Sequence, residues 1–269
     1  MKKTIRREKL LRVAIEAAIE AGKEILTVYG TDDFEIVTKE DQSPLTLADR
    51  KAHEKIMAYL TATEIPVLSE EGKEIPMEER REWDIFWLVD PLDGTKEFIK
   101  RNGEFTVNIA LIENCIPVLG VIYVPVTEVL YFGEKETGAF KAAGAATTWY
   151  DEHFVADSIP VGHEERPFTI VGSRSHMNED TRQFIEENSK DVGSYEVISK
   201  GSSLKLCMVA EGAADLYPRF GPTMEWDTAA GHAIVLASGA SITIADTGEP
   251  LLYNKESLLN PFFIVSREA

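Results

Sequence analysis

One stretch of the sequence limits the possible folds of this chain more than any other. It runs from Trp87 to Thr95 and reads Trp-Leu-Val-Asp-Pro-Leu-Asp-Gly-Thr. An apolar run, Ile85 to Val89, ends in two aspartates, Asp90 and Asp93, which are separated by a proline and a leucine. A buried strand that ends in a stiff turn of this kind directs two carboxylates at one point, and Mg²⁺ needs such convergent oxygen ligands. The same residue types are common in ordinary turns, so the stretch alone also fits a structural turn.

The composition indicates an acidic globular protein. Of the 269 residues, 44% are hydrophobic and 28% are charged, and 46 acidic against 28 basic residues give a formal net charge of -18. Such a chain has no broad basic face to release counterions from a nucleic-acid polymer, so we expect no polymer partner. An anionic small molecule would need a bound metal or a local basic pocket. Cys115 and Cys207 lie in apolar surroundings without metal-ligand spacing, which indicates reduced thiols in a cytoplasmic protein.

The N-terminus combines basic residues with an apolar stretch. The basic side chains there are Lys2, Lys3, Arg6, Arg7, Lys9 and Arg12. Glu16, Glu20 and Glu24 interrupt the apolar positions, so the pattern predicts an amphipathic helix and not a secretory signal. No run reaches the roughly 18 apolar residues of a transmembrane span. The basic start leaves open a peripheral contact with the cytoplasmic face of the inner membrane, beside the alternative of a solvated helix face.

The patterns of predicted elements divide the chain into two halves. Residues 1–145 are expected to form an N-terminal α+β subdomain, in which helices precede an antiparallel meander of strands starting near residue 105. Residues 146–269 alternate strands and helices, as a C-terminal α/β subdomain does. The sequence therefore predicts a mixed α/β protein of two subdomains.

Further acidic residues stand where predicted elements begin or end. Asp49 lies in the first turn of a helix for which Thr46 is the expected N-cap. Glu70 follows a short strand, and Asp227 follows Trp226 at the start of a helix of small residues. Side chains at such positions can be aimed into one cleft, and a partly buried carboxylate needs a partner. Asp227 also fits a simple helix cap.

Three acidic motifs follow one another in the chain: Glu70-Glu71, Asp90-Pro-Leu-Asp93-Gly-Thr95, and Trp226-Asp227-Thr-Ala-Ala-Gly-His232. Together they resemble the signature of the inositol monophosphatase superfamily of Mg²⁺-dependent, lithium-sensitive phosphatases. Residues 92–98, 201–205 and 217–223 resemble, more narrowly, the bacterial CysQ-type 3'(2'),5'-bisphosphate nucleotidases. The resemblance covers nearly the whole chain and departs at no metal-ligand position. It implies a layered α/β/α/β/α sandwich of the inositol monophosphatase/fructose bisphosphatase type, with the site between two subdomains.

The resemblance implies two or three Mg²⁺ ions in each site. One would be held by Glu70, Asp90 and the carbonyl oxygen of Leu92, and a second by Asp90, Asp93 and Asp227. The four carboxylates carry a formal charge of -4, which matches the +4 of two ions. The loaded site is then neutral before substrate arrives, which lets a strongly acidic protein accept a multiply charged phosphate ester.

The resemblance also implies a direct, in-line attack of a metal-activated water on phosphorus. Thr95, paired with Asp49, would orient the water or accept its proton. A threonine alone is a poor base, so this role requires the carboxylate of Asp49 nearby. These two residues are the expected catalytic pair.

The substrate contacts that the resemblance implies come from both halves of the chain: Gly94, Thr95, Ser173, His176, Gly201, Lys205 and Asp227. Gly201-Ser202-Ser203 precedes a predicted helix, where backbone N–H groups favour anions, and Lys205 can meet a second phosphate as a point charge. Ser202 and Ser203 also fit simple helix capping, and His176 fits a loop residue that only forms hydrogen bonds.

The expected reaction removes the 3'-phosphate of the nucleotide adenosine 3',5'-bisphosphate to give AMP and phosphate, with 3'-phosphoadenylyl sulfate as a further candidate substrate. An inositol monophosphatase or a sugar bisphosphatase of the same fold is the alternative, and a non-catalytic, divalent-ion-binding regulator is a distant one. A haloacid-dehalogenase-like mechanism through an aspartyl-phosphate does not fit, because Pro91 stands where its Asp-x-Asp motif needs an aspartate. The oligomeric state stays open.

Overall fold

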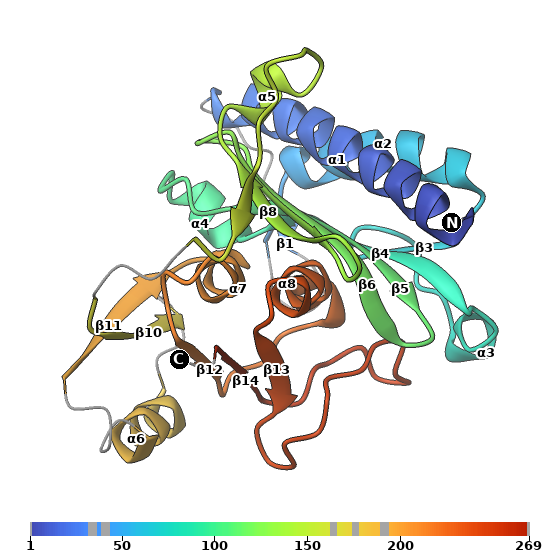
Figure 1. Cartoon of the computed structure of the whole chain (residues 1–269). Helices are drawn as coiled ribbons and strands as arrows, with labels where there is room; N and C mark the ends of the chain where they lie inside the picture. The colour runs from blue at the N-terminus through green and yellow to red at the C-terminus, as the bar shows by residue number, and fades with distance from the viewer. Residues whose placement is uncertain are drawn as a thin grey trace.

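The protein consists of five stacked layers of helices and sheets (Figure 1). The computed structural model describes residues 2–31, 37–38, 44–161, 166–173, 178–188 and 194–267. In order, the layers are a helix pair, a seven-stranded sheet, a second helix pair, a five-stranded sheet and an outer helix. The layered α/β sandwich expected from the sequence is therefore confirmed.

The first helix pair covers one face of the seven-stranded sheet. It consists of α1 (Lys2–Tyr29) and α2 (Leu47–Leu60), which pack against each other and against the central strands. Helix α1 buries small and branched residues at three- and four-residue steps, such as Ala14, Ala18 and Ile25. Helix α2 begins as predicted, because Thr46 caps it and Asp49 completes the capping box.

The seven-stranded sheet has the order β3-β4-β5-β6-β7-β8-β9. Only the β3–β4 pair is parallel among these neighbours, so the predicted antiparallel meander is present. The strands are β3 (Val67–Ser69), β4 (Ile85–Asp93), β5 (Thr106–Glu113), β6 (Ile116–Val124), β7 (Val129–Glu134), β8 (Gly138–Ala142) and β9 (Asp157–Ile159). Short helices lie between them: η1 (Thr61–Thr63), α3 (Met77–Arg80), α4 (Thr95–Ile99) and α5 (Ala145–Thr148). The subdomain boundary at 145/146 stays a prediction, and β9 lies beyond it.

The middle helices, α7 (Leu204–Ala210) and α8 (Glu225–Ala237), lie between the two sheets. Helix α8 is apolar nearly all round, as a helix buried on both sides must be. It approaches β6 so closely that a Cβ on Gly120 would lie 2.1 Å from the carbonyl oxygen of Ala230. Glycine at this position therefore permits the contact that brings the start of α8 to the seven-stranded sheet.

The second sheet has the order β11-β10-β12-β14-β13 and mixes parallel and antiparallel pairs. Its strands are β10 (Phe168–Ser173), β11 (Tyr195–Lys200), β12 (Leu216–Arg219), β13 (Ser241–Ile244) and β14 (Phe263–Ser266). The outer helix α6 (Glu179–Asn188) packs against β12. A separate two-stranded ribbon pairs β1 (Val37–Thr38) with β2 (Pro44–Leu45).

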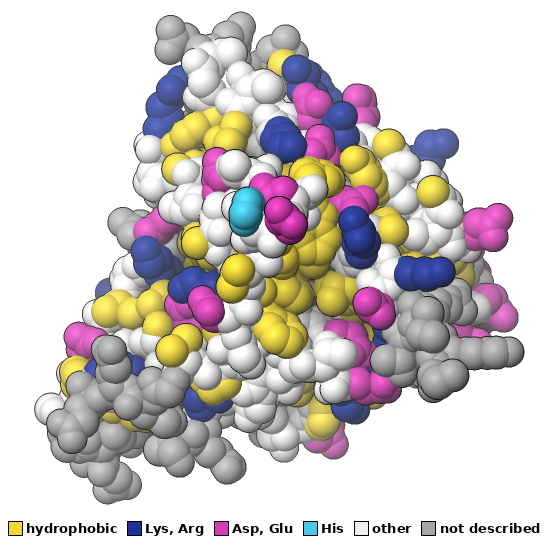
Figure 2. Space-filling view, turned by 45° about the horizontal axis from the view of Figure 1, so that its top comes forward, with side chains coloured by type: hydrophobic (Ala, Val, Ile, Leu, Met, Phe, Trp, Pro, Cys, Tyr) yellow, Lys and Arg dark blue, Asp and Glu magenta, His cyan; other side chains and the backbone are white. Residues whose placement is uncertain are grey.

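The basic residues of the N-terminal helix are partly engaged by carboxylates. The Arg7 guanidinium is buried and donates to Glu113 and Glu134 at 2.8 and 2.9 Å, and Arg12 donates to Glu16. On the face in Figure 2, basic and acidic side chains of the described residues are interspersed. Within those residues no helix has the length and apolarity to cross a membrane. Peripheral membrane contact stays a prediction.

Candidate active site

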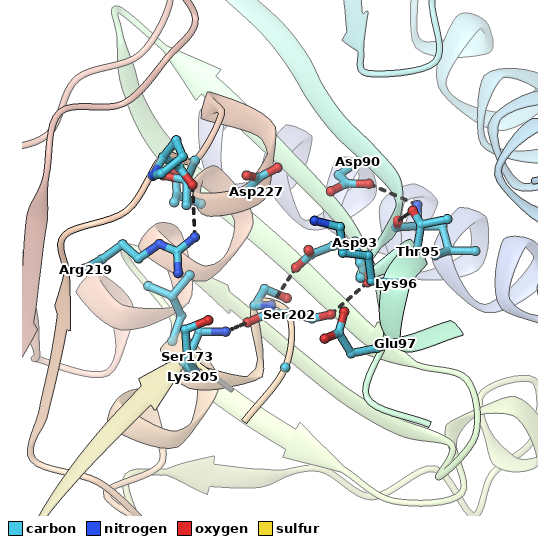
Figure 3. Close-up of a pocket in the computed structure, with 18 of the residues that line it drawn as sticks. Asp90, Asp93, Thr95, Lys96, Glu97, Ser173, Ser202, Lys205, Arg219 and Asp227 are labelled. Atoms are coloured by element: carbon cyan, nitrogen blue, oxygen red, sulfur yellow. Dashed lines mark hydrogen bonds between the residues drawn. The ribbon is translucent and has the colours of Figure 1, made fainter. Parts of the chain in front are cut away.

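A cavity of about 270 Å³ is lined by residues from both halves of the chain (Figure 3). It brings together most of the predicted metal and substrate residues: Glu70, Asp90, Leu92, Asp93, Gly94, Thr95, Ser173, Gly201, Lys205 and Asp227. Asp49 lies behind Thr95 and contacts its hydroxyl. His176 lies outside the described residues. Glu70 and Asp227, which are 157 positions apart in the chain, therefore line the same cavity.

The two aspartates of the first motif stand on either side of an irregularity within β4. Asp90 pairs with Asn108 and Asp93 with Thr106 of β5, and the register shifts between these pairs. Pro91 has no N–H to donate to the ladder, so the chain bulges outward there. The Leu92 amide donates to Oδ1 of Asp90 at 3.0 Å, which holds the bulge. The predicted strand-end turn is thus a bulge in a continuing strand, and it directs both carboxylates into the cavity.

Glu70 is held at the end of β3 by contacts on both sides. Its amide donates to the Val89 carbonyl oxygen at 3.1 Å, which continues the parallel pairing with β4. The preceding residue, Ser69, has its hydroxyl 2.9 Å from Nδ1 of His53 on α2. Helix α2 therefore supports the turn that carries Glu70 as well as carrying Asp49.

Asp227 both caps its helix and faces the cavity. One carboxylate oxygen, Oδ2, accepts a hydrogen bond from the Met224 amide at 2.8 Å, as a residue at the third position of a helix can do. Asp227 also lines the cavity opposite the β4 bulge (Figure 3). The sequence suggested both a helix cap and a cavity residue for Asp227, and the two are compatible, because only Oδ2 takes part in the cap hydrogen bond.

The grouped carboxylates raise one another's pKa values. Burial raises the pKa of Asp90 well above its usual value, and the negative charges of Glu70, Asp93 and Asp227 raise it further. Burial also raises the pKa of Asp93 to about 6, against the opposing effects of Lys205 and the Ser203 amide. The pKa of Asp227 is raised well above its ordinary value by burial and by Asp93. The protein thus concentrates negative charge where only protons or cations can compensate it.

The donor set of this cavity fits a hard divalent cation. Carboxylate oxygens and the carbonyl oxygen of Leu92 are the ligand types that Mg²⁺ prefers. The negative charge of Glu70 is one of the causes that raise the pKa of Asp90, and a bound cation would compensate that charge. Across the residues that the structure describes, no three or more His, Cys, Asp and Glu side chains already have the spacing of a metal cluster.

Two cations face the carboxylates from the C-terminal half. Lys205 is buried, and burial lowers its pKa to about 8 in spite of the nearby charge of Asp93. Arg219 at the end of β12 is 8% exposed, and its Nη2 donates to the Pro222 carbonyl oxygen at 2.9 Å. Among the described residues, its Nε has no hydrogen-bond partner. Lys205 was among the predicted substrate contacts. Arg219, which lies in the 217–223 segment of the resemblance, was a candidate phosphate contact outside that set.

The turn of Gly201, Ser202 and Ser203 contacts two carboxylates of the N-terminal half, those of Asp93 and Glu104. The Ser203 amide donates to Oδ2 of Asp93 at 2.6 Å, and the Gly201 amide donates to Glu104 at 2.8 Å. Helix α7 begins only at Leu204. The Gly201 and Ser203 amides therefore donate to carboxylates of the protein.

The chain as a whole matches one known family. The model of the inositol monophosphatase family matches residues 6–263. The chain belongs to the inositol monophosphatase family. Members of this family are metal-dependent phosphatases, and Mg²⁺ is their typical metal.

Curated relatives within this family share almost the full length of the chain. It is 48% identical over 261 residues to the 3'(2'),5'-bisphosphate nucleotidase CysQ of Escherichia coli (strain K12), covering 96% of this chain and 99% of that protein. The corresponding CysQ of Haemophilus influenzae is 35% identical over 261 residues, which cover 96% and 93%. The similarity to CysQ inferred from the motifs is therefore confirmed.

Solved structures agree with this assignment. The crystal structure of CysQ from Bacteroides thetaiotaomicron has a TM-score of 0.88 and 53% identity, and covers 97% of this chain and 98% of its own. The extragenic suppressor protein suhB of Bartonella henselae has a TM-score of 0.76 and 27% identity, with coverage of 97% and 94%. The layered fold of the chain is thus the fold of the inositol monophosphatase family.

Proposed function

We propose that this protein is a Mg²⁺-dependent phosphatase that removes the 3'-phosphate of adenosine 3',5'-bisphosphate and releases AMP and phosphate. The observation that carries the proposal is the division of one cavity into two walls of opposite charge. Asp90, Asp93 and Asp227 belong to the acidic wall, and Lys205 and Arg219 belong to the basic one. Lys96 and Glu97 line the same cavity. The similarity to proteins named 3'(2'),5'-bisphosphate nucleotidase supports the same substrate class.

The acidic wall supplies the oxygen ligands for two or three Mg²⁺ ions. Glu70, Asp90, the Leu92 carbonyl, Asp93 and Asp227 would hold them. When bound, the ions would stabilise negative charge on the phosphoryl oxygens and lower the pKa of a coordinated water. Oδ2 of Asp93 already accepts from Ser203, which orients this carboxylate for the cavity.

Thr95 and Asp49 form the proposed proton-handling pair. The Thr95 hydroxyl lines the cavity and can donate to Oδ1 of Asp49 at 3.3 Å. It can then accept a hydrogen bond from a water that attacks phosphorus, which fixes the direction of the water's lone pair. The proton leaves the water toward the Thr95 oxygen, and Asp49 takes the hydroxyl proton.

The basic wall supplies contacts for a second anionic group. Lys205 and Arg219 lie across the cavity from the carboxylates, so an ester with two phosphates can meet both walls at once (Figure 3). The buried Arg219 guanidinium, whose Nε has no partner within the part of the chain that the structure describes, would gain a charge-assisted hydrogen bond when an anion arrives. Inositol 1-phosphate has no second anion to use this wall, whereas 3'-phosphoadenylyl sulfate does, and we include it as a second substrate.

A substrate panel tests the proposal. Phosphate release is measured from adenosine 3',5'-bisphosphate, 3'-AMP and inositol 1-phosphate, with Mg²⁺ and with a chelator. We expect the bisphosphate to have the highest kcat/KM and release to stop without Mg²⁺. Faster release from inositol 1-phosphate would instead indicate an inositol monophosphatase, and metal binding without any release would indicate a regulator. A trapped phospho-enzyme would contradict direct attack by water.

A further inference from the structure

The turn of residues 201–203 is held in place by a carboxylate that lies outside the substrate cavity. The Gly201 amide donates to Oε2 of Glu104 at 2.8 Å. The Ser202 hydroxyl lies 2.8 Å from two carbonyl oxygens, those of Glu104 and Asp93. Ser202 adopts a left-handed conformation with φ of 49°, so the turn depends on these contacts to keep its shape.

This turn positions groups on both walls of the cavity. The Lys205 ammonium donates to the carbonyl oxygens of Lys200 and Ser202, so the place of the turn sets the place of this charge. On the other side, the Ser203 amide donates to Oδ2 of Asp93. A shift of the turn would therefore move the basic wall relative to the acidic one.

Glu104 itself lies behind the turn. It lines a separate cavity of about 370 Å³ together with apolar residues such as Val126, Leu204 and Met208. Its Oε1 lies 3.4 Å from the Lys200 ammonium, which is 42% exposed. Glu104 is not among the residues that line the substrate cavity, so it acts on the substrate indirectly, through the turn and through the effect of its charge on Lys205.

We propose that Glu104 is a positioning residue that sets the distance between the two charged walls, and so determines selectivity for esters with a second anion. The proposal rests on the proposed function. The ion pair with Lys200 contributes little, because the Lys200 side chain is 42% exposed, and Glu104→Gln separates the charge of the carboxylate from its acceptor oxygen. The essential feature is an acceptor oxygen for the Gly201 amide.

Kinetic measurements on two substrates distinguish this positioning role from simple support of the fold. A loss of support alone would lower the thermal stability and the amount of active enzyme, and would scale the kcat of all substrates equally. A misplaced basic wall would instead raise KM for adenosine 3',5'-bisphosphate and leave 3'-AMP, which lacks the second phosphate, nearly unaffected. The ratio of the two kcat/KM values is therefore the diagnostic quantity.

The test compares Glu104→Ala with Glu104→Gln, which keeps an oxygen acceptor at the same reach. We expect Glu104→Ala to raise KM for the bisphosphate about tenfold or more, the size expected on losing a hydrogen bond to a charged group. Its KM for 3'-AMP and its kcat should stay within about twofold of the wild type. Glu104→Gln should recover most of the lost selectivity.

Lys200→Gln is the matched control, because it removes the ion pair to Glu104 and leaves the Gly201 hydrogen bond in place. Its selectivity should equal that of the wild type. An unchanged bisphosphate KM in Glu104→Ala, an equal loss for both substrates, or a Glu104→Gln variant as impaired as Glu104→Ala would each overturn the proposal. A wild-type protein that does not cleave the bisphosphate would contradict the proposed function instead.

Discussion

The hydroxyl oxygen of Thr95 lies 3.3 Å from Oδ1 of Asp49, although 46 positions separate the two residues in the chain. The other oxygen of Asp49 is already engaged. Oδ2 accepts from the amide and the hydroxyl of Thr46 at 2.7 and 2.5 Å. The capping box of α2 therefore fixes the carboxylate, and only Oδ1 is directed at Thr95.

We predict that Asp49→Asn lowers kcat at least about 100-fold, the usual contribution of a positioned general base. The amide is isosteric and its oxygen can still accept from the Thr46 amide, so the free energy of unfolding should fall by only about 1 kcal/mol. Phosphate release and thermal unfolding measured on the same preparation check both parts. A variant that turns over nearly as fast as the wild type would remove Asp49 from the catalytic pair.

A pair of Thr95 variants provides the control for this assignment. Thr95→Ser keeps the hydroxyl and should retain most of the activity, whereas the isosteric Thr95→Val removes it and should resemble Asp49→Asn. Because the two residues act as one unit, the double variant should lose little more than either single variant. Additive losses would show that they act separately.

The sequence predicted the acidic wall well because its residues stand in contiguous motifs. Asp90 and Asp93 come directly after an apolar run, and this local pattern favours their convergence on one point, although alone it also fits a structural turn. Local reasoning missed the bulge, because the ladder that continues to Asp93 is set by pairing with β5, a distant segment. Propensity describes a residue's own conformation, and strand register depends on its neighbours in space.

The basic wall was harder to predict for a related reason. An arginine in a sequence is almost always exposed, and nothing local shows that Arg219 is buried beside Lys205. The same limit applies to the Gly201–Ser203 turn. The sequence left open anion binding and simple helix capping there, and it did not show that the Ser203 and Gly201 amides donate to Asp93 and Glu104.

Arg219→Met should raise KM for adenosine 3',5'-bisphosphate about tenfold or more and leave KM for 3'-AMP within about twofold. The variant loses a charge-assisted contact with the second phosphate of the bisphosphate, whereas 3'-AMP has no second phosphate and loses no contact. The melting temperature should change little, because Met fills a similar volume and removes an Nε that has no partner among the described residues, but also removes the hydrogen bond from Nη2 to the Pro222 carbonyl oxygen. Arg182→Met on α6 is the control, since this arginine is exposed and should affect neither substrate. Equal changes for both substrates would contradict a role for Arg219 in binding the second anion.

Gly94→Ala should abolish most activity, because two effects coincide at this position. Gly94 has φ of 92°, which a residue with a Cβ rarely adopts, and that Cβ would lie 2.2 Å from the Ser202 hydroxyl oxygen. Ser202 would have to give up its contacts with Asp93 and Glu104. We expect kcat/KM to fall at least tenfold, with a stability loss of about 1–3 kcal/mol.

Gly144→Ala separates the backbone effect from the contact. Gly144 also has a positive φ, of 63°, but a Cβ there would meet nothing within 4 Å. This variant should lose about 1 kcal/mol of stability and keep its kcat/KM. If both variants lose activity to the same degree, the contact with Ser202 is not the reason for glycine at position 94.

The stabilisation of the protein by Mg²⁺ should rise with pH between about pH 4 and 7. The pKa values of Asp90, Asp93 and Asp227 are raised in the folded protein, and that of Asp93 is raised from a usual value of 3.8 to about 6. Without metal, these groups therefore keep their protons to a higher pH than in the unfolded chain. A folded pKa above the unfolded one means that these groups stabilise the fold at low pH. That stability is lost as the pH rises from about 4 through about 6.

Mg²⁺ reverses this dependence because it binds the deprotonated carboxylates and must displace their protons. The shift in melting temperature on adding Mg²⁺ should therefore be small at pH 5 and reach its full size near pH 7. Asp93→Asn, which removes one of the titrating ligands, should reduce the shift at pH 7 and flatten its pH dependence. Melting curves with and without Mg²⁺ across this range check the prediction. A shift of equal size at pH 5 and pH 7 would show that the carboxylates of the cavity are not the ligands that Mg²⁺ deprotonates.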